Sequence, residues 1–191
     1  MENRPLELIV FYADLVCLAE TAEILSPKQL KRLSHTLLNE MTNVTRDFGG
    51  TVLKYVEDCV VGFFVLPAVG WTQQLDRALL CTEMMQKVME HSVGPIVQSE
   101  GLPAIGFRIG VDCGGVQVLS VRAEGIYTEV DAFGDIVNVA KKICDKAESG
   151  EVLIGKNLWR LLHASRKMGC TKRKSLVSDG ETYDLYSLEY Q

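Results

Sequence analysis

The sequence predicts an α+β domain in which a mixed, ferredoxin-like sheet carries helices over one of its faces. Strand-like and helix-like segments follow one another in the order β-α-α-β-β-α-β-β-α-β, which is typical of that plan. The chain has 191 residues, of which 47% are hydrophobic and 24% charged, and this suffices for one globular domain with its own core. Residues 1–191 are therefore expected to form a single domain.

The first half of the chain alternates between apolar strands and amphipathic helices. The pair Ser26-Pro27 is typical of a helix start, and the pair Gly49-Gly50 is typical of a helix end. Between these signals the apolar residues recur with a helical period. The expected elements are a strand over 6–14, a short helix over 20–25, a helix from 28 to the glycine pair, a strand-turn-strand over 51–66, a helix beginning at 71 and a loop over 93–103.

The second half contains shorter elements. The pair Gly114-Gly115 lies between two β-like runs and predicts the turn of a second hairpin. A change from loop to helical periodicity follows, with an apolar stripe from Ile136 to Ile143. The expected elements are strands over 105–113 and 116–121, that helix, a strand over 152–154, a helix over 156–162 and closing strands over 171–177 and 183–188.

Acidic residues end two of the predicted strands. The turn within 51–66 carries Glu57 and Asp58, and the first strand ends on Asp14. If these strands are neighbours, Asp14 and Asp58 converge at one end of the sheet as a pair of carboxylates suited to divalent cations. The alternative interpretation is an ordinary solvated turn, with both aspartates acting as strand-end caps.

The two arms of this hairpin differ in character. On the first arm, the alternation of strand side chains places Val52, Lys54 and Val56 on one face. Lys54 is then a single charge in an otherwise apolar row, so it is expected at a sheet edge or beside a partner. The second arm is apolar almost throughout, which predicts a strand covered on both faces. The acidic turn is therefore expected at the rim of a buried sheet.

Composition and charge argue against several classes of function. A formal charge of −5 argues against a nucleic-acid-binding surface, and the run 172–174 is too short a basic segment to reverse this. The three histidines and six cysteines show no zinc-ligand spacing, so the thiols are interpreted as core residues in a reducing compartment. No signal peptide and no membrane-spanning stretch is recognised, and a cytoplasmic protein is expected.

Several motifs lie along the chain in a fixed order. They are the aromatic-x-Asp segment that ends at Asp14, a G-G-x-x-x-K-x-x-x-D hairpin over 49–58, R-I-G-x-x-x-G over 108–114, G-x-x-V-N-x-A over 134–140 and G-E-V-L-I over 150–154. Each motif is weak alone. In this order they cover almost the whole chain, which thereby resembles the class III nucleotidyl cyclase catalytic domain, the family of adenylate and guanylate cyclases.

The resemblance implies a two-metal site. Asp14 and Asp58 would bind two Mg²⁺ or Mn²⁺ ions, with the backbone carbonyl of Leu15 assisting. The site would support attack of a ribose 3′-hydroxyl on the α-phosphate and release of pyrophosphate. The loop whose backbone cradles the phosphates in the family corresponds here to Val16, Cys17, Leu18 and Ala19.

The resemblance also implies adenine as the base and a homodimer as the active unit. Lys54 and Asp131 fall on the base-recognition pair, and a Lys/Asp pair is the adenylate cyclase pattern, since a lysine donates and a carboxylate accepts. Asn138 falls on the ribose-orienting residue, and Lys142 falls on the transition-state arginine. In the family these groups meet the metals only across a head-to-tail dimer, and this chain carries both sets. The chain is thus expected to convert ATP to cyclic AMP as a symmetric homodimer.

Departures from the family pattern keep two alternatives open. Lys142 replaces the arginine, Glu57 replaces a glycine before the second aspartate, and Cys17 and Ala19 replace a glycine and a hydroxyl residue of the phosphate loop. The late phosphate-binding lysine of the family has Lys174 as its nearest counterpart. One alternative is a degenerate domain that binds nucleotide for regulation. The other is a cyclase that uses GTP or a pyrimidine nucleoside triphosphate.

Overall fold

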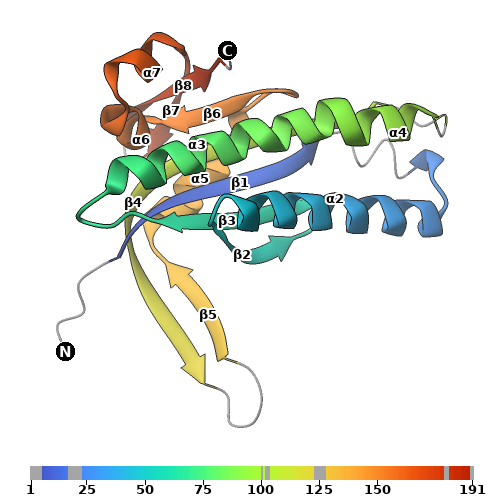
Figure 1. Ribbon diagram of the computed structural model, residues 1–191, viewed down its shortest axis with the longest axis horizontal. Helices are drawn as coiled ribbons and strands as arrows, with labels where there is room; N and C mark the ends of the chain where they lie inside the picture. Colours follow the sequence, from blue (N-terminus) through green and yellow to red (C-terminus); the bar gives the residue numbers. More distant parts are fainter. Residues whose placement is uncertain are drawn as a thin grey trace.

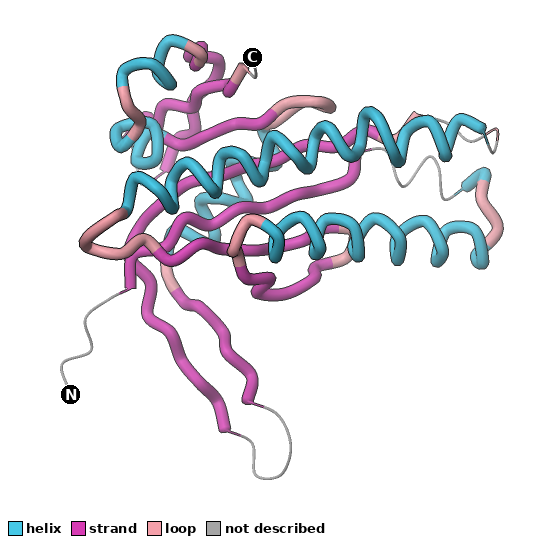
Figure 2. The backbone as a smooth tube through the Cα atoms, viewed as in Figure 1, coloured by secondary structure: helices cyan, strands magenta, loops and turns pink. Residues whose placement is uncertain are grey.

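The computed structural model describes residues 6–16, 23–99, 101, 104–122, 128–178 and 181–189. Its strands are β1 (Leu6–Val16), β2 (Thr51–Val56), β3 (Cys59–Val65), β4 (Gly106–Arg122), β5 (Thr128–Phe133), β6 (Val152–Gly155), β7 (Cys170–Ser178) and β8 (Glu181–Leu188). Its helices are α2 (Pro27–Asp47), α3 (Trp71–Val88), the π-helical turn η1 (Met89–Val93), α4 (Gly94–Ser99), α5 (Asp135–Lys146), α6 (Lys156–Leu161) and α7 (Ala164–Met168). Figure 2 shows the course of these elements by type.

The central strand of the sheet is β1. It lies between β3 and β4 and is antiparallel to both. β2 continues the sheet beyond β3, while β6, β8 and β7 continue it beyond β4, to which β6 is parallel. β5 pairs only with the far half of β4, and the two form a ribbon that extends away from the body of the sheet (Figure 1). The order β2-β3-β1-β4, with α2 and α3 as connections, is ferredoxin-like, so the predicted mixed α+β fold is confirmed.

Helices cover both faces of this sheet. α2 and α3 run side by side over the face to which β1 contributes Ile9 and Phe11, and all share one buried cluster (Figure 1). α5 packs on the opposite face, in a second cluster with Leu8 and Val10. The expectation of helices over one face is therefore wrong for α5. The reason lies in β1 itself, because its residues from Leu8 to Ala13 are buried in unbroken sequence, and such a strand needs cover on both faces.

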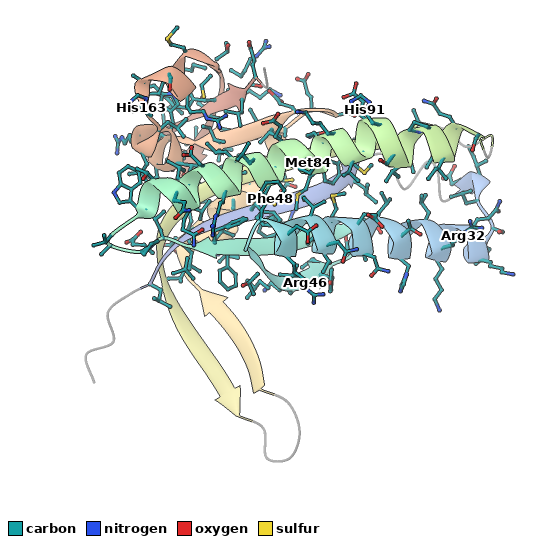
Figure 3. All side chains as sticks on the ribbon, viewed as in Figure 1. Arg32, Arg46, Phe48, Met84, His91 and His163 are labelled. Carbon is teal, nitrogen blue, oxygen red and sulfur yellow. The ribbon has the colours of Figure 1, made fainter. Side chains whose placement is uncertain are left out.

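α2 begins and ends where the sequence predicts. Ser26 caps the helix: its side chain accepts a hydrogen bond from the Gln29 backbone, and the Gln29 side chain accepts one from the Ser26 backbone. Beyond the last turn, Gly49 has a φ of +80°, a left-handed conformation that glycine adopts without strain. In Figure 3, Arg32 and Arg46 lie toward the two ends of this helix.

The predicted turn at Gly114-Gly115 is not a turn. β4 continues through both glycines, and it pairs with β1 up to Val116 and with β5 from Gln117 onward. A Cβ on Gly114 would lie 3.3 Å from the Cβ of Ile136. The glycine therefore permits close packing of α5 against β4, and the chain reverses only beyond β4.

Other segments also differ from expectation. The loop predicted over 93–103 is largely helical, since η1 and α4 follow α3 as far as Ser99 and bury Val93 and Val97 in the cluster of α2 and α3. β5 and α7 are additional elements, each too short to show a clear period. Of the short helix predicted over 20–25, residues 20–22 lie outside the described residues. Among the helices that the structure does describe, none is long and apolar enough to cross a membrane.

Candidate functional site

The far end of β1 changes from buried to accessible at Asp14. Residues from Leu8 to Ala13 are buried, whereas the Asp14 side chain is 22% exposed. Asp14 pairs in register with Cys59 on β3 and with Arg108 on β4. The β2–β3 turn ends directly before Cys59, so its acidic residues close the same end of the sheet. The neighbouring strands thus bring together the two strand-end acids that the sequence singled out.

A pocket of about 190 Å³ opens beside Asp14, between this end of the sheet and the C-terminal half of α5. We call it the Asp14 pocket. Its charged lining residues are Asp14, Glu57, Arg108, Lys141 and Asp145, and its remaining wall is formed by Tyr12, Val56, Cys59 and Cys144. The pocket therefore combines carboxylates and cations from three strands or turns and one helix.

Arg108 forms an ion pair with Asp14. Its Nε and Nη2 groups donate to Oδ2 of Asp14 at 3.0 and 2.7 Å. Partial burial lowers the pKa of Arg108, but the hydrogen bond and the charge of Asp14 outweigh this, so the pKa of the guanidinium is raised overall. Arg108 belongs to the R-I-G-x-x-x-G motif, but no role was assigned to it from the sequence. The missing information was the register between β1 and β4, which places Arg108 opposite Asp14.

Asp145 and Lys141 of α5 extend this group of charges. Nζ of Lys141 lies 3.0 Å from both carboxylate oxygens of Asp145. The hydrogen bond that Lys141 donates to Asp145 is the main reason that the pKa of Lys141 is raised. Asp145 in turn lies near the guanidinium of Arg108, with 3.9 Å between Oδ1 and Nη2. Neither residue was recognised as part of the site from the sequence, although their i,i+4 spacing on a predicted helix was a usable signal.

The acidic turn has an unusual backbone. Glu57 is the one described residue other than glycine with a positive φ, at +53°. Burial is the main cause that raises the pKa of Asp58, and the negative charges of Asp14 and Glu57 add to it, while a hydrogen bond to the Ser34 side chain opposes it. Asp14 and Asp58 are therefore close enough to repel each other. The side chain that lines the pocket, however, is that of Glu57.

Two thiols form part of the pocket wall. Burial raises the pKa of Cys144 to about 12 and also raises that of Cys59, so both are protonated near neutral pH. Both are free and buried, as the interpretation of the cysteines as core residues requires. A Cβ on Gly110 would overlap the backbone nitrogen of Cys144, so glycine on β4 allows α5 to lie close enough to complete this wall.

The row predicted for Val52, Lys54 and Val56 is interrupted within β2, where Lys54 keeps its face with Val56 but not with Val52. The β2–β3 register shifts between Val52 and Lys54, which marks a bulge at Leu53. Val52 packs in the cluster of α2 and α3, whereas Leu53 packs with the cluster of α5 and Lys54 pairs with Val61 of that same cluster. The prediction that Val52 and Lys54 share a face is therefore wrong, because the bulge inserts one residue. Lys54 is exposed on the α5 side of the sheet.

The other predicted site residues are dispersed. Asn138 and Lys142 are both exposed on α5, and neither lines the Asp14 pocket. Asp131 lies on β5 in register with Leu119, and its side chain lies outside what the structure describes. Leu15 is buried and follows Asp14 on β1. Of the predicted phosphate loop, Val16 ends β1, and Cys17, Leu18 and Ala19 lie outside the described residues.

Lys174 makes its contacts outside the Asp14 pocket. Its Nζ lies 2.8 Å from Oε1 of Glu148 and 2.8 Å from the backbone carbonyl oxygen of Lys146, with Oε2 of Glu151 at 3.8 Å. These contacts join β7 to the connection between α5 and β6. Lys174 therefore serves this corner of the fold and does not line the Asp14 pocket.

The donors near Asp14 fit a hard divalent cation. Asp14 and Asp58 supply carboxylate oxygens, which Mg²⁺ and Mn²⁺ prefer, and a bound cation would relieve the repulsion that helps raise the pKa of Asp58. Within the described ranges, no three His, Cys, Asp or Glu residues are grouped so as to hold a metal. An ion here would thus take at most two side-chain ligands and fill its shell with substrate, backbone or water oxygens, as Mg²⁺ commonly does.

A second aspartate of the sheet has the opposite surroundings. Asp112 on β4 is 0% exposed. Its carboxylate accepts hydrogen bonds from the backbone N–H groups of Cys113 and Leu158, at 2.9 and 2.8 Å, and from the hydroxyl of Tyr183. Burial raises the pKa of Asp112 to about 6, although these hydrogen bonds oppose the rise. Asp112 thus ties β4 to α6 and β8.

Comparison with known proteins identifies similar sequences. The family described as "Adenylate and Guanylate cyclase catalytic domain" matches residues 3–189 of the chain. A cytidylate cyclase of Escherichia coli is 24% identical over 184 residues, which is 93% of this chain and 37% of that protein. A cytidylate cyclase of Staphylococcus aureus is 22% identical over 146 residues, which is 75% of this chain and 34% of that protein. The chain therefore spans little more than a third of the length of these relatives.

Solved structures give the same architecture. The crystal structure of the adenylyl cyclase CyaB from P. aeruginosa matches with a TM-score of 0.87 and 25% identity, over 100% of this chain and 97% of that one. The crystal structure of the guanylyl cyclase Cya2 matches with a TM-score of 0.84 and 20% identity, over 98% and 94% of the two chains. The predicted fold is therefore confirmed by comparison with whole solved structures as well as by the strand order.

Proposed function

The chain belongs to the family of adenylate and guanylate cyclase catalytic domains, and we propose that it cyclises ATP to 3′,5′-cyclic AMP with release of pyrophosphate. The observation that carries the proposal is the Asp14 pocket, in which a partly exposed carboxylate lies beside an acidic turn and two cations. This arrangement suits a site where divalent cations meet a polyanionic substrate. Asp112, by contrast, is buried and accepts hydrogen bonds from backbone N–H groups, which suits a carboxylate that serves the fold.

In this proposal Asp14 and Asp58 hold Mg²⁺ or Mn²⁺, and the backbone carbonyl of Leu15 is a further oxygen donor. When bound, such ions stabilise charge on phosphate oxygens and lower the pKa of a coordinated hydroxyl. Asp14 suits the role because it is accessible and yet lies within β1, directly after a run of buried residues, which fixes its position. Arg108 and Lys141 place positive charge beside the negative charge that a triphosphate brings.

We further propose that the active unit is a symmetric homodimer. Lys141 and Asp145 of α5 line the Asp14 pocket, whereas Asn138 and Lys142 of the same helix are exposed and do not line it. A second copy would therefore be needed to bring Asn138 and Lys142 to the substrate held at Asp14. Lys142 would then offset charge that develops on the transferring phosphoryl group, and Asn138 would orient the ribose.

Lys54 and Asp131 are the proposed base readers. A lysine donates a hydrogen bond to an unprotonated ring nitrogen, and a carboxylate accepts one from an exocyclic amino group. Adenine offers this pair of groups side by side. Guanine and uracil offer a carbonyl oxygen and a ring N–H instead, so the Lys/Asp pair favours ATP over GTP and UTP.

CTP is the second candidate substrate. Cytosine also carries an amino group beside an unprotonated ring nitrogen, so the edge read by Lys54 and Asp131 is common to cytosine and adenine. The observation that favours CTP is that both curated relatives described above are cytidylate cyclases. Because a purine is larger than a pyrimidine, the separation between the base readers and Asp14 in the dimer would decide between the two.

Product analysis tests the proposed reaction. The protein is incubated with Mn²⁺ and each of ATP, CTP, GTP and UTP, and cyclic nucleotide and pyrophosphate are measured by mass spectrometry. Cyclic AMP and equimolar pyrophosphate are expected from ATP. Cyclic CMP as the main product would show that the substrate is CTP and not ATP. Cyclic GMP would contradict the roles of Lys54 and Asp131. Absence of every product, with nucleotide-dependent thermal stabilisation, would indicate a regulatory nucleotide-binding domain.

Complementation tests the composite site. Asp14→Ala and Lys142→Ala proteins should each be inactive or nearly so as homodimers. After mixing and subunit exchange, each heterodimer has one intact site, so about a quarter of the wild-type activity should return. No recovery despite measured exchange would contradict a site shared between two copies.

A further inference from the structure

Asp145 joins the two cations of the Asp14 pocket. Nη2 of Arg108 lies 2.7 Å from Oδ2 of Asp14 and 3.9 Å from Oδ1 of Asp145. Nη1 of the same guanidinium donates to the backbone carbonyl oxygen of Asp145 at 3.4 Å. On its other side, the Asp145 carboxylate is held by Lys141 through two contacts of 3.0 Å. Four charges of alternating sign thus run from Asp14 to Lys141.

Arg108 neutralises the carboxylate that a divalent cation needs. The guanidinium contacts of 2.7 and 3.0 Å both end on Oδ2 of Asp14. A divalent cation at Asp14 would therefore be repelled by the guanidinium unless Arg108 moves away. Asp145 offers an alternative partner, because its backbone oxygen already accepts from Arg108 and its Oδ1 lies 3.9 Å from Nη2 of Arg108. Arg108 can thus change partner without leaving the pocket.

We propose that Asp145 is a positioning residue that competes with Asp14 for Arg108 and thereby sets the affinity of Asp14 for divalent cations. Lys141 opposes Asp145, because its ammonium group reduces the negative charge that attracts the guanidinium. This inference rests on the proposed function, in which Asp14 is a metal ligand. Metal binding at Asp14 and transfer of Arg108 to Asp145 are then two parts of one exchange.

Mn²⁺ titration without nucleotide tests the exchange directly, with free Mn²⁺ measured by electron paramagnetic resonance. Asp145→Asn should weaken Mn²⁺ binding about threefold, the scale expected for a partly exposed ion pair. Lys141→Met should strengthen it by a similar factor, because it releases Asp145 to attract Arg108. Asp145→Glu keeps the carboxylate and should restore wild-type affinity. Unchanged affinity in Asp145→Asn would overturn the inference.

A double-mutant cycle separates competition for Arg108 from the general field of a nearby charge. If Asp145 acts through Arg108, then in an Arg108→Gln background the Asp145→Asn change should alter Mn²⁺ affinity by less than about 1.5-fold. An effect of the same size in both backgrounds would show that Asp145 acts only through its charge, and would overturn the exchange. Arg108→Lys, which cannot contact both aspartates with a fork, serves as the background if Arg108→Gln does not fold.

Asp184→Asn is the matched control, because Asp184 pairs with Lys172 at 2.7 Å on β7 and β8 and does not line the pocket. It should leave Mn²⁺ affinity unchanged. If the wild-type protein neither binds Mn²⁺ nor forms a cyclic nucleotide, the proposed function fails together with this inference. If it forms a cyclic nucleotide and binds Mn²⁺ without coupling between Asp145 and Arg108, only this inference fails.

Discussion

Asp14 and Asp112 lie on adjacent strands of one sheet, but their surroundings differ in every respect that matters for function. Asp14 is 22% exposed, and its hydrogen-bond donors belong to a side chain, that of Arg108. Asp112 is 0% exposed, and two of its donors are backbone N–H groups. A side-chain partner can be exchanged for a ligand, whereas a backbone partner is fixed by the fold. The same residue type can therefore serve ligand binding in one place and folding in the other.

The two aspartates also differ in how their charge acts. The negative charge of Asp14 acts on neighbouring groups, since it helps to raise the pKa values of Asp58 and Cys144. Asp112 is itself the perturbed group, because burial raises its pKa to about 6. The comparison suggests that changes at Asp14 affect activity with little effect on stability. Changes at Asp112 should do the reverse.

The largest expected effect is that of Asp14→Ala on turnover. Loss of a proposed metal ligand should remove several kcal/mol of transition-state stabilisation and slow cyclisation by about a thousandfold or more. The free energy of unfolding should change by less than about 1 kcal/mol, because the ion pair with Arg108 is partly exposed. Cyclic nucleotide formation and urea denaturation measure the two quantities. If the variant is active, Asp14 is not a metal ligand. If the variant does not fold, Asp14 serves the fold, as Asp112 does.

Asp112→Ala should lower the free energy of unfolding by about 3–5 kcal/mol, because two buried N–H groups and the Tyr183 hydroxyl lose their acceptor. Urea denaturation measures the loss. The control is Asp184→Asn, which breaks a more exposed pair with Lys172 and should cost less than about 1 kcal/mol. A loss at Asp112 no larger than that of the control would contradict its assignment to the fold.

Stability should also depend on pH through Asp112. The unfolded chain releases this proton near pH 3.8 and the folded chain near pH 6, so the folded state binds more protons between these values. Stability from this residue is therefore greatest below about pH 4 and declines by about 2–3 kcal/mol as the pH rises to about 6. Denaturation at a series of pH values should show a decline that Asp112→Asn lacks. Parallel curves for the two proteins would contradict the raised pKa.

Much of the fold follows from local signals. Ser26, Pro27 and the glycines after Asp47 define α2, and turn residues define the β2–β3 hairpin, because capping and turn chemistry act over a few residues. The role of Gly114 could not be found in this way. A glycine pair between two β-like runs is typical of a turn, and only the packing of Ile136 against it shows why glycine is needed within a strand.

The site was predictable to the extent that it depends on where strands end. Asp14 lies near the end of β1 and Asp58 in the β2–β3 turn, and the antiparallel pairing of β1 with β3 brings them to one end of the sheet. Arg108 and Asp145 needed the cross-strand register and the packing of α5, neither of which is a local property. Val52 was wrongly placed in one row with Lys54 and Val56, because a bulge depends on the partner strand. The roles of all the predicted site residues stay predictions, and for Asp131 and residues 17–19 the described structure does not extend to the side chains.

The smallest expected effect is at Glu57, where the Asp14 end of the sheet carries strain that the Asp112 region lacks. Glu57→Gly should raise the free energy of unfolding by about 1 kcal/mol, because glycine adopts a φ of +53° without cost and repulsion with Asp58 is removed. Gly150→Ala is the matched control, since it places a Cβ at a φ of +82° in open space and should lower stability by a similar amount. If Glu57→Gly is more stable but cyclises nucleotide more slowly, the strained glutamate is retained for the site. If it is less stable, the positive φ at Glu57 is not a source of strain.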